Sequence, residues 1–111
     1  MITPYDSPQL DMILEALANQ KRRGIVHYLS LQPATVSQLA KDHSLSLPAI
    51  HKHIRILEKA QLIVRKKVGR TNFVALNSKT LQLAKDWIGQ YNTRFSSTSA
   101  SLENYISRMR E

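Results

Sequence analysis

The stretch HSLSLPAIHKHIRILEKAQLIVRKKVGRTNFVALN, residues 43–77, joins a predicted amphipathic helix to a predicted basic hairpin. From about residue 46 to 60 the apolar residues recur at helical spacing, and the pattern then changes to β-branched and aromatic residues around Gly69. Residues 43–79 contain eight Lys or Arg against one acid, Glu58, and so carry +7 of the chain's net charge of +8. This local excess of positive charge indicates an anionic partner.

The helix predicted from about 46 to 60 has two different sides. The 100° step of a helix gathers three apolar residues on one side, namely Ile50, Ile54 and Leu57. The other side carries the basic and imidazole side chains of His51, Lys52, Arg55 and Lys59. One side therefore suits the protein core and the other suits an anionic surface.

A second, shorter helix precedes this one. Thr35 and Gln38 form a predicted capping box for the segment TVSQLAKDH, and Ser46 is the predicted N-cap of the longer helix. Two helices joined by a tight turn, the second with a basic side, predict a helix-turn-helix over about 35–60. The basic side can then enter the major groove of DNA.

The segment from about 62 to 77 predicts a β-hairpin, the wing. Glycine at the first central position of the loop, Gly69, suits a two-residue type II′ turn. Lys66 and Lys67 point to opposite faces of a strand, so we expect only one of them to face DNA. Arg70 at the tip is expected to contact phosphate or the minor groove, the alternative being an exposed turn residue.

Helical spacing predicts further helices at about 8–18, 20–31 and 78–109. The last is expected as one long helix, although weak helix formers leave open whether residues 96–101 are helical. A chain this small would expose the apolar stripes of its first and last helices, which predicts a dimer interface. Plain burial there is favoured over an apolar ligand pocket. The interface residues are Leu10, Ile13, Leu14, Leu81, Ala84, Trp87, Ile88, Tyr91 and Phe95.

Composition restricts the class of protein. A chain of 111 residues suits one domain, residues 1–111, and a pI near 10.1 indicates a nucleic acid or an acidic membrane surface as partner. No apolar run approaches the roughly 18 residues of a membrane span, and the first residues lack a signal-peptide layout, so we expect a cytoplasmic protein. The absence of cysteine excludes disulfides and thiolate ligands. No nucleophile motif, phosphate loop or paired carboxylates indicate an enzyme.

Three segments, in this order, resemble parts of the ArsR family of winged helix-turn-helix repressors. LANQKRRGIVHYL resembles the opening of its second helix, TVSQLAKDHSLSLPAIHKHIRILEKAQLI its helix-turn-helix, and VGRTNFVALN its wing. The resemblance implies a mainly α fold with a small β-hairpin, and a homodimer formed by the first and last helices. It also implies that the dimer binds double-stranded DNA at an inverted-repeat operator and blocks transcription.

Some residues depart from the family pattern. The segment TVSQLAKDH lacks the cysteine pair, and residues 78–111 lack the histidine, with which metal-sensing members bind metal. The chain therefore resembles metal-independent members; no cofactor is expected, and the inducing signal is left open. Ser44 and Gln61 stand where glycines are usual, which predicts strain from positive φ.

The predicted DNA contacts lie on the basic side of the second helix of the motif and on the wing: Ser46, Ala49, His51, Lys52, Arg55, Lys59, Lys67 and Arg70. The sequence leaves open which of Lys52 and Arg55 reads a base and which binds phosphate. Arg22 and Arg23 fit a structural ion pair as well as a phosphate contact.

Two alternatives are weaker. His51 and His53 diverge by about 200° on a helix and cannot chelate one metal ion together, and His53 is expected to form a hydrogen bond at the edge of the core. An alternative function is a winged-helix module that docks an acidic protein through the same helix. The clustering of charge on the predicted groove-facing part of the chain favours DNA.

Overall fold

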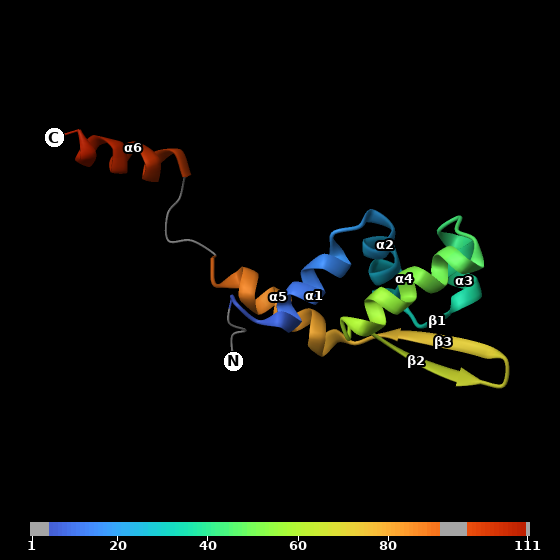
Figure 1. Ribbon diagram of the computed structural model, residues 1–111. Coiled ribbons are helices and arrows are strands. Elements are labelled where there is room, and N and C mark those ends of the chain that lie inside the picture. The colour runs from blue at the N-terminus through green and yellow to red at the C-terminus, as the bar shows by residue number, and fades with distance from the viewer. Residues whose placement is uncertain (1–4, 92–97, 111) are drawn as a thin grey trace.

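A computed structural model describes residues 5–91 and 98–110 and contains helices around a small antiparallel sheet (Figure 1). The elements in chain order are α1 Pro8–Leu17, α2 Gln20–Leu31, β1 Ala34–Thr35, α3 Val36–Asp42, α4 Leu47–Lys59, β2 Ile63–Val68, β3 Thr71–Leu76, α5 Ser78–Gly89 and α6 Thr98–Met109. The predicted fold class, mainly α with a winged helix-turn-helix, is confirmed.

The helices begin where the sequence places cap residues. Ser7, Asn19 and Ser46 each accept a hydrogen bond from a backbone N–H in the first turn of α1, α2 and α4, respectively. At α3, Thr35 Oγ1 accepts from Gln38 N at 3.1 Å while Gln38 Oε1 accepts from Thr35 N at 2.9 Å, which is the predicted capping box. These side chains satisfy backbone donors that would otherwise lack a partner.

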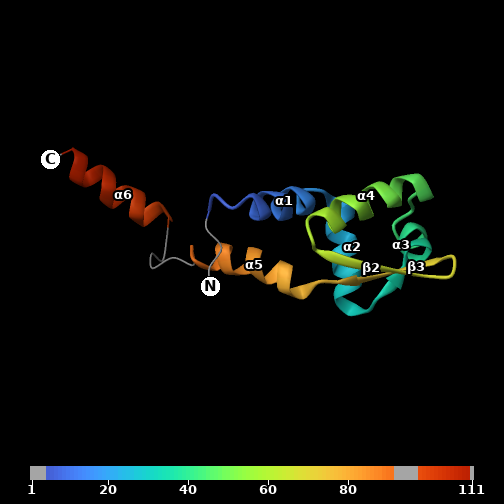
Figure 2. The same cartoon turned by 60° about the horizontal axis from the view of Figure 1, so that its bottom comes forward.

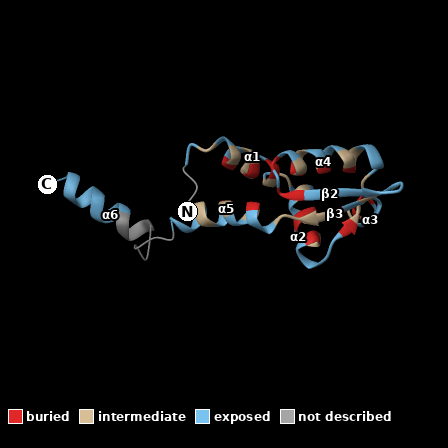
Figure 3. Cartoon of the chain, turned by 90° about the horizontal axis from the view of Figure 1, so that it is seen from below, coloured by how far each residue is buried: buried red, intermediate tan, exposed pale blue. Residues whose placement is uncertain are grey.

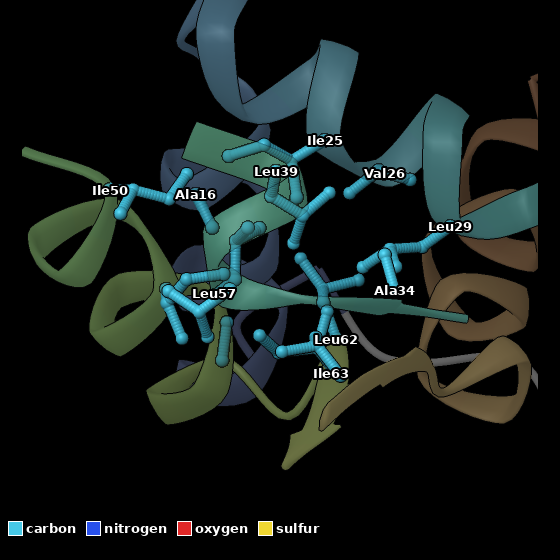
Figure 4. Packing of buried hydrophobic residues seen from close by; sticks show 14 of the residues in the cluster. Ala16, Ile25, Val26, Leu29, Ala34, Leu39, Ile50, Leu57, Leu62 and Ile63 are labelled. Atoms are coloured by element: carbon cyan, nitrogen blue, oxygen red, sulfur yellow. The ribbon is translucent and has the colours of Figure 1, made fainter. Parts of the chain in front are cut away.

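The core lies where α1, α2, α3 and α4 meet the sheet (Figure 4). Ile25 from α2, Leu39 from α3 and Leu57 from α4 are fully buried there. Ile50 and Ile54 are buried as well, so the apolar side of α4 packs inward as the sequence predicts. Burying a side chain of this size contributes roughly 1.5–3 kcal/mol, which makes α4 an integral part of the core.

The sheet contains one strand more than the predicted hairpin. β1 pairs antiparallel with β3, with Ala34 opposite Val74, and the strand order is β1-β3-β2. β1 was not predicted, because it is only two residues long and leads directly into α3. It attaches the start of the helix-turn-helix to the base of the wing.

The wing has the predicted two-residue loop. Val68 lies opposite Thr71, and of the two loop residues only Gly69 has a positive φ, 62°, as a type II′ turn requires. The loop lies at the same end of the molecule as α3 and the start of α4, whereas α5 lies at the other end (Figure 2).

The single helix expected over about 78–109 is instead two helices. α5 ends at Gly89, and the amides of Gln90 and Tyr91 form tight-turn hydrogen bonds to Trp87 O and Ile88 O, at 3.2 and 3.0 Å. Glycine is a poor helix former, which favours an end at this position. Residues 98–101 are helical as part of α6, and residues 92–97 lie outside the described residues.

Two residues other than glycine have a left-handed backbone, as the sequence predicts. φ is 54° at Ser44, after α3, and 62° at Gln61, after α4. In both places the next residue donates its N–H back to the helix: Leu45 N to Ala40 O at 2.8 Å, and Leu62 N to Leu57 O at 3.0 Å. This 6→1 pattern ends a helix in a Schellman motif, in which the left-handed residue is usually glycine.

We expect Gln61→Gly to stabilise the protein by up to about 1 kcal/mol, because glycine removes the left-handed strain at φ 62°. The matched control is Gln90→Gly, at the exposed end of α5 where φ is −60°. There glycine relieves nothing and only adds freedom to the unfolded chain. Urea unfolding measures both; equal destabilisation by the two variants would show that Gln61 is not strained.

Candidate nucleic-acid interface

α4, the recognition helix, has a basic outer side. Lys52, Arg55 and Lys59 are exposed, on the side opposite the buried Ile54. Ser46 Oγ accepts from Ala49 N at 3.3 Å, so the first two predicted DNA contacts also begin the helix. The basic side chains predicted from the sequence are therefore all accessible to a ligand.

The recognition helix, the start of α3 and the tip of the wing enclose a shared hollow of about 430 Å³. His51 of the recognition helix and Arg70 of the wing, predicted separately, both line it. Its other lining residues are Thr35, Val36, Ser37, Leu47, Thr71 and Asn72. The fold thus brings the two predicted DNA-binding elements to one concave surface.

Ser37, Thr71 and Asn72 also line this hollow, although the sequence did not predict them as DNA contacts. The strand register offered a signal for Asn72, which lies directly opposite Lys67 in the hairpin. Opposite residues of an antiparallel pair point to the same face, so if Lys67 contacts DNA, Asn72 is expected to face the DNA as well. Hydroxyl and amide groups can bond to phosphates or base edges.

The register also separates the two wing lysines. Lys67 and Asn72 share a face with Val74, which is buried in the core, and with Arg65, which contacts Glu58 of α4. Lys66 lies opposite Phe73 on the other face of the sheet. Lys67, the lysine predicted to contact DNA, is therefore the wing lysine on the side of the recognition helix.

An ion pair attaches the wing to the recognition helix. Arg65 of β2 donates through Nη2 to Glu58 Oε1 at 3.0 Å and through Nε to Glu58 Oε2 at 3.3 Å. Both groups are partly exposed, so the pair adds little stability, but its two-point geometry orients the strand. The pair also engages the one acid in the basic stretch.

Arg22 and Arg23 form no ion pair within the described part of the chain, and their guanidinium groups bond to backbone carbonyls instead. Arg22 donates through Nε to Ala16 O at 2.6 Å and through Nη2 to Glu15 O at 3.2 Å, and Arg23 donates through Nη1 to Leu17 O at 3.0 Å. Both side chains therefore cap the carbonyl end of α1, where positive charge is favoured.

His53 lies at the edge of the core, as predicted, with Nδ1 3.3 Å from Arg22 Nη1. Burial lowers the pKa of this imidazole below its ordinary value of 6.5, and the positive charges of Arg22, Lys52 and Lys21 lower it further. His43 is held elsewhere, through Nδ1 and Leu39 O at 2.8 Å. Within residues 5–91 and 98–110, no three His, Asp or Glu side chains group as metal ligands.

The predicted dimer residues divide into three groups. Leu10 and Ile13 are buried within the single chain, which corrects their assignment because they have no surface left for a partner, whereas Ala84, although buried, lines an apolar groove together with Leu81 and Ile88. Leu14, Leu81 and Trp87 are half-buried, and Ile88 and Tyr91 are each 58% exposed. Phe95 lies outside the described residues.

An apolar groove on α1 and α5 contains three of these accessible residues, Leu81, Ile88 and Tyr91. Leu17 and Lys85 are among its other lining residues. Trp87 contacts Tyr91 edge to face, with ring centroids 5.3 Å apart, and its buried Nε1–H finds no acceptor in the described part of the chain. In Figure 3, residues 102–109 of α6 are exposed, whereas α5 contains exposed, intermediate and buried residues.

None of the described helices is both long enough and apolar enough to pass through a lipid bilayer.

Comparison with known proteins identifies a family. Residues 19–64 match the family described as bacterial regulatory protein, arsR family. The HTH-type transcriptional regulator Rv2034 of Mycobacterium tuberculosis is 31% identical over 93 residues, which cover 84% of this chain and 85% of that protein.

Solved structures agree. An ArsR family transcriptional regulator, RHA00566, has a TM-score of 0.72 at 36% identity, covering 81% of this chain and 91% of its own. A domain of Mb0332 from Mycobacterium bovis, described as a homodimeric winged helix-turn-helix DNA-binding domain, has a TM-score of 0.63 at 16% identity. It covers 84% of this chain and all of its own, and shows the fold alone.

The lowered pKa of His53 predicts a pH dependence of stability. The unfolded chain binds a proton at His53 more readily than the folded chain does. The contribution of neutral His53 to the free energy of unfolding is therefore complete above about pH 6.5 and decreases as the pH falls below it. His53→Gln removes this titration. The difference in free energy of unfolding between the two proteins, measured from pH 8 to pH 5, should change only below about pH 6.5; a constant difference would contradict the assignment.

Proposed function

Because the chain belongs to the ArsR family and is a transcriptional regulator with a winged helix-turn-helix domain, we propose that it is a repressor that binds an inverted-repeat operator as a homodimer. The family and the curated relatives are regulators rather than enzymes. The proposed repressor acts in the cytoplasm, binds double-stranded DNA and requires no metal or cofactor.

The hollow shared by His51 and Arg70 is the observation that supports DNA as the ligand. Lys52 and Arg55 stand beside it on the exposed side of the recognition helix, and Lys67 lies on the matching face of the wing. A helix with a basic side can lie in the major groove of DNA, and the wing can then contact the adjacent DNA backbone. Lys and Arg are suited to guanine edges and phosphates, while Ser46 and Ala49 bring the start of the helix close to the DNA.

The apolar groove of α1 and α5 supports the homodimer. Ile88 and Tyr91 are large side chains that the single chain leaves largely in water. A second copy related by two-fold symmetry would bury the same residues of both chains and place two recognition helices on successive major grooves, about 34 Å apart. We retain Leu14, Leu81, Trp87, Ile88 and Tyr91 as the proposed interface.

Lys52→Ala with Arg55→Ala should weaken DNA binding by at least tenfold and reduce the salt dependence, by about 0.9 in the log–log slope for each lost phosphate contact. Lys79→Ala, at the start of α5, removes a charge outside the proposed surface and is the control. Gel shifts on DNA selected from a random pool, at several salt concentrations, measure both effects. Equal losses in the two proteins would contradict the assignment, and binding of an acidic protein in place of DNA would favour a docking module.

Ile88→Asp should dissociate the dimer at micromolar concentration, because it places a charge in an apolar interface. Leu31→Asp introduces the same charge at a side chain that is 74% exposed on α2, outside the proposed interface, and should leave the dimer intact. Sedimentation velocity distinguishes the two species. A monomeric parent protein, or dissociation by both variants alike, would contradict the proposed interface.

A further inference from the structure

One side chain, Arg22, connects three helices. It belongs to the first turn of α2, where its backbone N–H donates to the Asn19 side chain at 3.1 Å. Its guanidinium reaches α1 through Ala16 O at 2.6 Å and Glu15 O at 3.2 Å, and α4 through His53 Nδ1 at 3.3 Å. The planar guanidinium holds these acceptors in one rigid arrangement.

The contact with His53 has a defined direction. Arginine has donors and no acceptors, so His53 Nδ1 must accept, and the neutral ring carries its proton on Nε2. A protonated His53 would lose this hydrogen bond and face the charge of Arg22. The lowered pKa of His53, caused by burial and then by Arg22, Lys52 and Lys21, agrees with the neutral form.

The neighbouring arginine provides an internal comparison. Arg23 also caps α1, through Leu17 O at 3.0 Å, but within the described residues it forms no hydrogen bond to α4. Both arginines thus cap the carbonyl end of α1, but only Arg22 also contacts His53. This contact connects α1, a helix of the proposed dimer interface, to the recognition helix.

The place of this contact along α4 matters for DNA binding. His53 adjoins Lys52 and lies near the middle of a helix of 13 residues, which is about 20 Å long. The later part of α4 already meets α1, where Ile56 and Lys59 line a hollow with Met12, Glu15 and Ala16. A second attachment at His53 therefore restrains rotation of α4 about this contact, and a small rotation would displace the DNA-facing start of the helix.

We propose that Arg22 is a positioning residue that holds the recognition helix at a set angle to α1, and that this tie determines which spacing between half-sites the dimer accepts. The inference rests on the proposed homodimer and inverted repeat. The distance between two recognition helices depends on how each is held relative to the dimer helices, and operator spacing mirrors that distance. Arg22 acts without touching DNA.

The experiment uses the full chain and an inverted repeat that the unaltered protein selects from a random DNA pool. Affinities are measured on this repeat, on a single half-site, and on repeats whose spacer is one or two base pairs longer or shorter. Arg22→Ala and His53→Leu should leave half-site affinity and salt dependence unchanged, while the preference for the selected spacing falls by about tenfold, as loss of a charged hydrogen bond allows. Arg23→Ala is the matched control and should keep the preference.

One further variant, compared with His53→Leu, separates positioning from general damage. His53→Gln keeps an acceptor for Arg22 and should restore most of the spacing preference that His53→Leu loses. His53→Leu also leaves the bonds from Arg22 to α1 in place, so it tests the tie even if Arg22→Ala fails to fold. Equal spacing preferences in Arg22→Ala, His53→Leu and Arg23→Ala would overturn the proposal, as would a lower half-site affinity with a reduced salt slope, which would make Arg22 a phosphate contact.

A measurement without DNA distinguishes failure of this inference from failure of the proposed function. Amide hydrogen exchange should accelerate in the last turn of α1 and around His53 in Arg22→Ala, but only in α1 in Arg23→Ala. If the unaltered protein selects no inverted repeat, the proposed function and the spacing rule both fail. If it selects one and exchange around His53 is the same in both arginine variants, the tie alone is refuted.

Discussion

The structure depends on burial of one side of the recognition helix. Ile50, Ile54 and Leu57 have no exposed surface, and each contributes roughly 1.5–3 kcal/mol. The like charges on the other side, such as Arg55 and Lys59 four residues apart, cost only a few tenths of a kcal/mol. Burial therefore decides which side of the helix faces the core, and the basic side chains must face outward whether or not a ligand is present.

This orientation becomes a binding surface because neighbouring elements are attached to the same helix. The ion pair from Glu58 to Arg65 holds β2 beside it, and β1 joins the start of α3 to β3. Arg70 is thereby brought to the hollow that His51 lines. At the other end of the molecule, the exposed Ile88 of α5 and Tyr91 just after it offer an apolar surface to a second copy.

Local rules were sufficient to predict much of this fold. The N-cap Ser46 and the capping box at Thr35 predicted two helix starts, and Gly69 predicted the loop of the wing, because each acts through neighbours in the chain. Spacing alone did not predict burial between helices. It assigned Ile13 of α1 to a dimer interface although the core of the single chain already buries this side chain, and it could not reveal that Arg22 reaches His53, 31 residues away.

Hydroxyl-radical footprinting of the DNA that the protein selects shows whether two recognition helices face DNA together. In that case the DNA backbone has two protected patches, about 34 Å apart on one face of the duplex and related by two-fold symmetry, with protection extending where the wings lie. A single patch, or weak protection spread evenly along the DNA, would contradict this arrangement.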